Sequence, residues 1–337
     1  MAKKKTSPDE QPAHLAMYRE VVKLFDQQMN WWDLARRNHL ALDNMERRTL
    51  YLFQGDGSSL KFQLQYNPER RRSAAAPTTE GPAEPPCFLC QENQPPEQMS
   101  VGWKSRWNEY RLQLNPYPIL HNHITIADMR HLPQSLNSGR LEDMVELSVL
   151  LPGWVVFFNG ARCGASAPHH FHFQAGLPDV PLCKEMARYA KTLPTHHLIH
   201  HDGEKFVGTI DTAGRFAIVG SAPRPIDVFQ FLDSAFLAIA ETTGDDDPPV
   251  NAIAWCEKQR GYFALFPRRR HRPSCYGTGE GQHLVSPATL EMAGVWPVAR
   301  KEDFDALTAT TLRGIYRELC VDADTAAAIV SRLKSIL

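Results

Sequence analysis

The sequence predicts an α+β protein in which helices flank antiparallel sheets. Apolar residues recur at helical spacing near the start of the chain, within residues 14–48, and again near its end, within 303–336. Between these stretches, residues 60–66 alternate apolar and polar side chains, which is typical of a half-buried strand. Two apolar runs at 250–255 and 262–267 are spaced as a hairpin. The presence of both helix-like and strand-like apolar patterns along one chain indicates the α+β class.

The helical segments follow from apolar spacing and from the residues that bound them. Within 14–48 the run Trp31-Trp32-Asp33 is a point at which the helix can be interrupted. The tryptophans fit a docking helix better than a cofactor role. Helices are predicted at 14–48, 141–151, 180–192, 226–241, 304–319 and 325–337.

The strands follow from alternation and from turn residues at their ends. Gly55-Asp56-Gly57 separates the first two strands and predicts a hairpin. The histidine-rich run 196–201 is predicted to be a solvated strand edge rather than a metal site. Strands are predicted at 49–53, 60–66, 123–127, 154–158, 170–174, 250–255 and 262–267.

Composition and charge exclude several classes of protein. The 337 residues carry 37 basic and 38 acidic side chains, a formal net charge of −1, so no basic surface for nucleic acid is expected. Neither a secretory leader nor an apolar run of membrane-spanning length is present. Seven cysteines, an odd number, do not indicate a disulfide framework. A cytoplasmic protein without nucleic-acid or membrane partners is therefore expected.

The most informative segment is Gly164 to Gln174, which contains the pattern His-x-His-x-Gln at His170, His172 and Gln174. On an extended strand, residues two apart share a face, so these three side chains point together. Immediately before lies the small-residue turn 159–166, which starts at Asn159 and contains Gly164 and Ser166. Backbone N–H groups in such a turn approach an anion closely. The combination indicates phosphate chemistry.

This pattern resembles the transferase and phosphorylase branch of the histidine-triad superfamily. That branch includes galactose-1-phosphate uridylyltransferase, diadenosine tetraphosphate phosphorylase and the GDP-hexose phosphorylases, and the local likeness is greatest to the last of these. The resemblance implies that His172 attacks the α-phosphorus of a nucleotide. Gln174, where hydrolases of the superfamily carry a third histidine, implies transfer to an acceptor. Gln174 and the N–H groups around Gly164 to Ser166 would hold the developing charge.

A second segment, 115–131, follows the order of the same superfamily. It reads as a proline-containing turn followed by a strand with His123 at one end and His131 at the other. The resemblance implies that Asn115 and Tyr117 line a nucleotide pocket and that His123 lies beside the catalytic strand. Asn159 and Gly164 are expected to contact the substrate as well.

Cys87 and Cys90 form a Cys-x-x-Cys pair. From the residues alone the pair is a metal knuckle, a redox dithiol or a coincidence. The proline-rich run before it does not suit a redox helix. Uridylyltransferase-like members complete a Cys2His2 site with two histidines, which here would be His131 and His170. The resemblance therefore implies a structural Zn²⁺, closed and tetrahedral.

Two arginine-rich runs are candidate phosphate contacts, since the guanidinium fork matches phosphate geometry. Residues 70–72 follow the strand at 60–66, and residues 268–270 follow the strand at 262–267. An arginine run is usually a solvated surface, so one contact from each run, Arg70 and Arg268, is the expectation.

The resemblance also sets the domain organisation. Residues 1–13 are expected to be a disordered tail. Residues 14–200 would form the catalytic histidine-triad-like half, with an N-terminal helix and a flexible loop at 73–86. Residues 201–337 would form a second, degenerate half with terminal helices, although no repeat is visible in the sequence. Related enzymes often form homodimers.

The expected activity is therefore that of a nucleotidyltransferase or phosphorylase. The substrate would be a nucleoside diphosphate-sugar or dinucleotide, with orthophosphate or a sugar 1-phosphate as acceptor. Two alternatives stay open at this point: a histidine-triad nucleotide hydrolase, and a non-catalytic zinc-stabilised nucleotide-binding protein.

Overall fold

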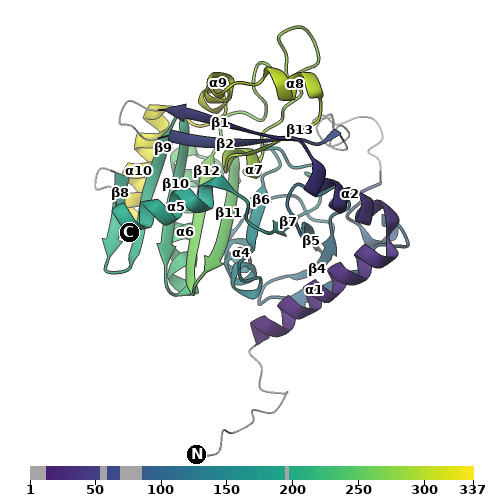
Figure 1. Cartoon of the computed structure of the whole chain (residues 1–337). Helices are drawn as coiled ribbons and strands as arrows, with labels where there is room; N and C mark the ends of the chain where they lie inside the picture. The colour runs from purple at the N-terminus through teal and green to yellow at the C-terminus, as the bar shows by residue number, and fades with distance from the viewer. Residues whose placement is uncertain (1–12, 54–58, 69–85, 194–196) are drawn as a thin grey trace, which may run out of the picture.

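The computed structural model describes residues 13–53, 59–68, 86–193 and 197–337, and it has the predicted α+β class (Figure 1). None of the described helices combines the length and apolar character needed to cross a bilayer. The helices are α1 (Ala13–Trp31), α2 (Asp33–Asn44), α4 (Ser138–Leu150), α5 (Pro181–Thr192), α6 (Pro225–Thr243), α7 (Thr289–Met292), α8 (Lys301–Ala306), α9 (Ala309–Leu319) and α10 (Ala323–Ile336).

The strands form one large antiparallel sheet and one small sheet. They are β1 (Arg47–Phe53), β2 (Ser59–Tyr66), β3 (Ser100–Lys104), β4 (Glu109–Leu114), β5 (Ile124–Asp128), β6 (Val155–Asn159), β7 (His172–Gly176), β8 (Leu198–Asp202), β9 (Lys205–Thr212), β10 (Arg215–Ala222), β11 (Val250–Glu257), β12 (Arg260–Pro267) and β13 (Val295–Val298).

The large sheet has ten strands in the order β3-β4-β5-β7-β6-β11-β12-β10-β9-β8. Each half of this order runs first-second-third-fifth-fourth in chain order. A helix, α4 or α6, connects the third strand of each half to the fourth. The two halves join edge to edge where β6 pairs antiparallel with β11. The second half therefore repeats the topology of the first, and the predicted boundary at 200/201 falls inside β8.

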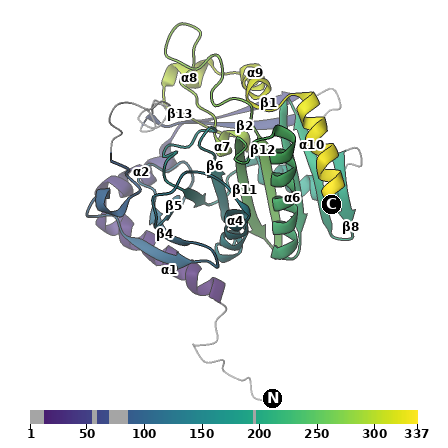
Figure 2. The same ribbon diagram turned by 180° about the vertical axis from the view of Figure 1, so that it is seen from behind.

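Both faces of the ten-stranded sheet are covered (Figures 1 and 2). One face packs against α1, α4, α6 and α10 and buries Phe171 and Phe173 of the catalytic segment. The other face packs against α5, α7, α8, α9 and the small sheet β1-β2-β13. In the small sheet β1 and β2 are antiparallel, as predicted, and β13 adds to β2 in parallel.

The first helical segment is interrupted at Trp32, within the run Trp31-Trp32-Asp33 where the sequence allowed a break; Trp32 has extended backbone and is buried with Ala35 and Leu114. Three predicted element boundaries are wrong. The second part of this segment ends at Asn44, before the predicted residue 48. The helix predicted at 304–319 is two helices, because Thr308 caps α9 by accepting a hydrogen bond from the N–H of Thr311. The strand predicted at 170–174 begins at His172.

Some predictions lie outside the described residues. They are the tail apart from Ala13, the glycine turn at 55–57, Arg70 to Arg72, and all but the last residue of the loop at 73–86. The run 196–201 is described from His197 onward. Its residues 198–201 lie in β8, the last strand of the large sheet, as predicted for a strand edge.

Helix α2 holds the loop that leads into β5. Asn38 donates a hydrogen bond to the carbonyl oxygen of Pro116 at 2.8 Å, and Nε2 of His39 lies 2.9 Å from the carbonyl oxygen of Asn115. Burial lowers the pKa of His39 to about 4. The imidazole is therefore neutral near pH 7, and its Nε2–H is the donor, because a carbonyl oxygen can only accept.

We expect His39 to make the fold sensitive to acid. In the unfolded chain its pKa returns to about 6.5, so between about pH 6.5 and 4 only the unfolded state binds the proton. Stability is full above about pH 6.5, falls as the pH drops towards 4, and levels off below that. The variant His39→Gln keeps an amide donor but cannot be protonated.

The measurement is the urea midpoint of both proteins at about pH 7 and about pH 5. The wild type should lose more stability than His39→Gln, by on the order of 1–3 kcal/mol. An equal loss in both proteins would show that His39 does not titrate in this way.

Candidate active site and metal site

His172 is the first residue of β7, in the middle of the first half of the sheet. β7 pairs with β5, where His172 lies opposite Ala127, and with β6, where Gln174 lies opposite Phe157. Phe171 and Phe173 enter the helix-covered core. His172 and Gln174 therefore share the opposite face of the sheet, as the alternation predicted.

The imidazole of His172 has a defined tautomer. Its Nδ1 lies 2.9 Å from the carbonyl oxygen of His170, and because that oxygen can only accept, Nδ1 carries the proton. Nε2 then keeps its lone pair. The side chain is 3 % exposed, and burial lowers its pKa to about 4. At neutral pH this group is an uncharged imidazole with one nucleophilic nitrogen.

Gln174 has a defined amide orientation for a similar reason. The backbone N–H of Ile119 donates to Nδ1 of His123 at 3.1 Å, so the proton of His123 sits on Nε2. Nε2 of His123 lies 2.9 Å from Oε1 of Gln174 and donates to it. The NH2 group of Gln174 is therefore directed away from His123. His123 is fully buried, so it supports Gln174, whereas the sequence predicted a substrate contact.

The turn at 159–166 runs from the end of β6 towards His172. A Cβ on Gly160 would lie 2.6 Å from the carbonyl oxygen of Val250, so only glycine fits there. Gly164 has φ of +91°, and a Cβ would lie 2.7 Å from that of Ala288. Ser166 is exposed on the turn. Within the turn, the N–H groups of Cys163 and Ala165 donate to the carbonyl oxygen of Gly160, so contact of this turn with an anion stays a prediction for the N–H groups of Gly164 and Ser166.

Asn159 and Arg268 support this turn from within. Oδ1 of Asn159 accepts a hydrogen bond from the N–H of Thr289 at 3.0 Å. Nη1 of Arg268, which is 3 % exposed, donates to Oδ1 of Asn251, and Nδ2 of Asn251 donates to the carbonyl oxygen of Cys163. The other nitrogen, Nη2 of Arg268, donates to carbonyl oxygens of its own loop. These contacts favour a supporting role for Arg268 over the predicted contact with an acceptor phosphate.

Asn115 shapes the loop that precedes β5. Its Oδ1 accepts from the N–H of Tyr117 at 2.9 Å, and its Nδ2 donates to Oγ1 of Thr125 at 3.1 Å. Thr125 lies directly opposite Gln174 in the sheet. The structure therefore brings Asn115, His123 and Gln174 together, with half-buried Tyr117 at the edge of the group.

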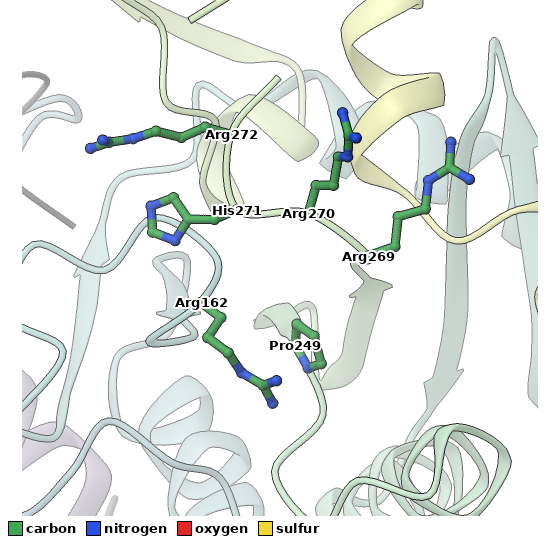
Figure 3. Close-up of a pocket in the computed structure, with 6 residues that line it drawn as sticks. All are labelled: Arg162, Pro249, Arg269, Arg270, His271 and Arg272. Atoms are coloured by element: carbon green, nitrogen blue, oxygen red, sulfur yellow. The ribbon is translucent and has the colours of Figure 1, made fainter. Parts of the chain in front are cut away.

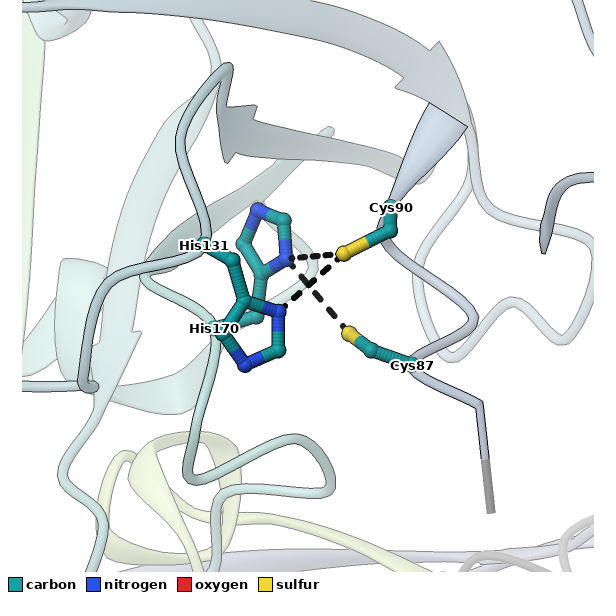
Figure 4. A group of neighbouring side chains, drawn as sticks. All are labelled: Cys87, Cys90, His131 and His170. Carbon is teal, nitrogen blue, oxygen red and sulfur yellow. Dashed lines mark hydrogen bonds between the residues drawn. The ribbon is translucent and has the colours of Figure 1, made fainter. Parts of the chain in front are cut away.

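Cys87, Cys90, His131 and His170 converge as predicted (Figure 4). Sγ of Cys90 lies 3.1 Å from Nδ1 of His131 and 3.5 Å from Nδ1 of His170, and Sγ of Cys87 lies 3.4 Å from the same atom of His170. With Zn–S near 2.3 Å and Zn–N near 2.0–2.1 Å, a tetrahedral site has S···N edges of about 3.5 Å. The four side chains therefore fit one tetrahedral metal ion.

The protonation of His170 also suits a metal. Nε2 of His170 lies 2.8 Å from the carbonyl oxygen of Asp128 and donates to it, which leaves the lone pair of Nδ1 facing the two sulfurs. Burial lowers the pKa of His170, so the ring is neutral. Burial and the adjacent Cys87 raise the pKa of the Cys90 thiol to about 11, so a bound cation is what would favour its thiolate form.

Three buried polar residues near the site were not predicted. Gln134 contacts the backbone of His172. Arg111 and Gln113 lie on β4, on the same face of the sheet as His172 and Gln174, and Nη2 of Arg111 donates to the carbonyl oxygen of Leu89 in the Cys-x-x-Cys knuckle. The alternation of Arg111 and Gln113 with Tyr110, Leu112 and Leu114 was a usable signal. Nothing local marks Gln134.

A surface depression of about 400 Å³ lies beside the turn at 159–166. The guanidinium groups around it do not converge: Arg269 and Arg270 extend to one side, and Arg162 and Arg272 extend in other directions (Figure 3). Each also has a contact elsewhere; Arg162, for example, donates to Asp245 at 2.7 Å. The depression is therefore not a converging clamp for an anion, despite its composition. Its lining residues are Arg162, Pro249, Arg269, Arg270, His271 and Arg272.

Part of the chain is similar in sequence to galactose-1-phosphate uridylyltransferases. A family model described as "Domain of unknown function (DUF4922)" matches residues 24–177. Galactose-1-phosphate uridylyltransferase of Lactobacillus helveticus is 28 % identical over 144 residues, which is 38 % of this chain and 29 % of that protein. The corresponding enzyme 1 of Streptococcus pneumoniae serotype 4 is 26 % identical over 113 residues, 30 % of this chain and 23 % of that protein. The matches thus span less than a third of these relatives.

The fold is shared with a solved structure over most of the chain. Yeast Ap4A phosphorylase in complex with AMP has a TM-score of 0.56 at 14 % identity, covering 87 % of this chain and 96 % of that one. Its complex with Ap4A has the same TM-score, covering 90 % and 97 %. The chain thus shares its fold with this phosphorylase, and part of it is similar in sequence to galactose-1-phosphate uridylyltransferases.

We expect the double variant Cys87→Ala/Cys90→Ala to lose bound metal and thermal stability. Its remaining histidines cannot hold a tetrahedral ion alone, and His170 would no longer be fixed before β7. Metal content by plasma mass spectrometry should fall from about one ion per chain to background, and Tm should fall with it. The control is Cys256→Ser, a half-buried cysteine on β11 outside the cluster. A wild-type protein purified without chelator that holds no stoichiometric metal would contradict the assignment.

Proposed function

We propose that this protein is a nucleotidyltransferase or phosphorylase that works through a covalent nucleotidyl-histidine at His172. The donor would be a nucleoside diphosphate-sugar or a dinucleotide, and the acceptor orthophosphate or a sugar 1-phosphate. The observation that carries the proposal is the state of His172: a buried, neutral imidazole whose Nδ1 proton is engaged by the His170 carbonyl, which leaves Nε2 free to attack.

In the first step Nε2 of His172 attacks the α-phosphorus of the donor. The N–P bond forms, and the bond from phosphorus to the bridging oxygen breaks, so the sugar phosphate (from a nucleotide sugar) or the second nucleotide (from a dinucleotide) departs with the electron pair. Nε2 has no proton to lose, so no separate base is needed. The ring becomes positively charged in the intermediate, and the hydrogen bond from Nδ1 to the His170 carbonyl strengthens.

In the second step an oxygen of the acceptor phosphate attacks the same phosphorus. The new O–P bond forms, and the N–P bond breaks with its electron pair returning to Nε2. His172 is thereby restored to its neutral tautomer. Splitting the transfer in this way replaces one difficult displacement by two easier ones.

Charge on the nonbridging oxygens would be held by Gln174 and by backbone N–H groups of the turn at 159–166. The hydrogen bond from His123 fixes the amide oxygen of Gln174 away from the phosphate and leaves its NH2 group as the donor. Donors oriented before the reaction stabilise a developing anion without reorganising. Ser166, which is exposed on this turn, would also help to stabilise the charge on these oxygens.

We further propose that the ion in the Cys2His2 cluster is Zn²⁺. Two thiolates and two neutral imidazoles in tetrahedral arrangement are the ligands of closed structural zinc sites. When bound, zinc would supply structure rather than chemistry, because all four positions are taken by protein atoms. The residue that it fixes is His170, two positions before His172.

The related proteins favour transfer over hydrolysis. They are a uridylyltransferase and a phosphorylase, and in both activities a phosphate-bearing acceptor takes the place of water. A hydrolase would turn over its substrate at the same rate with or without added phosphate. A binding protein would bind nucleotide and form no adduct.

We expect His172→Ala to abolish both turnover and adduct formation, because no other nitrogen is placed at this position. Intact-protein mass spectrometry after brief incubation with nucleotide sugars and dinucleotides should show the wild type gaining one nucleoside monophosphate. Adding orthophosphate or a sugar phosphate should remove the adduct. The matched control is His169→Ala, which removes an exposed neighbouring histidine and should behave as the wild type.

The adduct mass identifies the base. The variant His172→Gly should regain transfer when a preformed nucleotidyl imidazolide is supplied, since the imidazole then arrives with the substrate. An active His172→Ala enzyme would overturn the assignment of the nucleophile.

We expect Gln174→Ala to slow adduct formation by roughly 10²-fold, the usual effect of removing one oriented donor from a developing anion. Gln174→Glu should be slower still, because a carboxylate keeps the hydrogen bond from His123 but has no donor and repels the phosphate. Single-turnover rates measure both. Gln113→Ala, on the same face two strands away, is the control and should keep its rate. Equal rates in Gln174→Ala and the wild type would exclude this role for the amide.

A further inference from the structure

The ladder between β6 and β7 stops just before the nucleophile. The paired residues end at Phe157 and Gln174, and continuing the register would bring Asn159 opposite His172. The strands do not pair there. The N–H and C=O of His172 face this gap, and His172 is buried, so backbone groups without partners would be costly.

The side chain of Gln134 fills the gap. Its Oε1 accepts from the N–H of His172 at 2.7 Å, and its Nε2 donates to the carbonyl oxygen of the same residue at 2.9 Å. Nε2 also donates to the carbonyl oxygen of Asn159 at 2.9 Å. The amide of Gln134 thus replaces the missing hydrogen bonds between β6 and β7 and contacts residues on both sides of the gap.

Gln134 is itself fixed. It is 1 % exposed, and its backbone N–H donates to the carbonyl oxygen of Pro168 at 3.0 Å. Nearby, the N–H of Phe171 donates to the carbonyl oxygen of Leu132 at 2.6 Å. The segment 132–134 therefore runs beside 168–172 and carries the amide to one defined position.

We propose that Gln134 is a positioning residue for His172 in the transfer reaction, an inference that rests on the function proposed above. By holding both backbone groups of His172, Gln134 fixes the direction in which the imidazole leaves the chain. The His170 carbonyl fixes the rotation of the ring. Small displacements of a reacting atom from its attack geometry are costly in rate. Only a side chain with a donor and an acceptor at this length satisfies all three contacts.

The test compares Gln134→Met with a matched control. Methionine has nearly the shape of glutamine and removes all three hydrogen bonds. The control is Gln28→Met: Gln28 is fully buried and its amide also holds two backbone groups, the carbonyl oxygen of Glu97 at 2.8 Å and the N–H of Met99 at 2.9 Å, both remote from the site in the sheet order. Any loss of stability that comes simply from replacing a buried glutamine by methionine should appear in both variants.

Gln134→Met should form the nucleotidyl adduct roughly 10–10²-fold more slowly than the wild type. Its nucleotide Kd should stay within about threefold, and its metal content should not change, because neither the substrate nor the metal contacts Gln134. Gln28→Met should keep the wild-type adduct rate. If Gln134→Met does not fold, Gln134→Glu replaces it: the carboxylate keeps an acceptor for the N–H of His172 and loses both donors, so the rate should again fall.

A second readout separates this inference from the proposed activity. Nitrogen NMR of ¹⁵N-histidine-labelled protein reports the tautomer of His172, assigned by its loss in His172→Ala. The wild type should show one tautomer with the proton on Nδ1, and Gln134→Met should show a mixture. An adduct rate within about twofold of the wild type, with an unchanged tautomer, would overturn the inference. Absence of an adduct in the wild type would overturn the proposed activity, and the tautomer would then still decide whether Gln134 positions His172.

Discussion

The hydrogen bond from Nδ1 of His172 to the carbonyl oxygen of His170 is the contact on which the site depends. It sets the tautomer of His172 and leaves Nε2 unprotonated. The acceptor belongs to a residue whose ring joins the Cys2His2 cluster. A shift of His170 would therefore move the metal ligand and the acceptor of His172 together. Because of this coupling, a metal ion held by the Cys2His2 cluster would also fix the acceptor of the His172 hydrogen bond without touching a substrate.

Behind the sheet, a buried polar chain holds the same segment. Arg140 on α4 lies over the ring of Phe171 at 3.9 Å, pairs with Asp128 and donates to Tyr110. Burial would raise the pKa of Asp128, but hydrogen bonds from Arg130 and Arg140 outweigh it and lower that pKa, so the carboxylate stays charged. The carbonyl oxygen of Asp128 accepts a hydrogen bond from Nε2 of His170. Removing one member would leave a buried charge unpaired, which costs far more than a surface ion pair contributes.

How well the sequence predicted each feature depends on how far apart in the chain the residues that form it lie. Alternation places His172 and Gln174 on one face without knowledge of the fold, and the spacing of Cys87 and Cys90 marks a knuckle. The resemblance correctly brought His131 and His170 to that knuckle. The resemblance placed His123 in the site but did not give its role. Which ring nitrogen of His123 donates depends on the N–H of Ile119, and the sequence does not show that contact. Gln134 was missed because its partners are 25 and 38 residues away and its own loop has no distinguishing pattern.

The second half of the sheet supports the turn before His172. It has the strand order of the first half and joins it at β6 and β11, a relation that the sequence does not reveal. Asn251 on β11 holds the carbonyl oxygen of Cys163, and Arg268 after β12 holds Asn251. At the start of β11, the carbonyl oxygen of Val250 lies so close to Gly160 that a side chain on Gly160 is excluded. The turn before His172 is thus built on the second half, and the first half alone would lack its support.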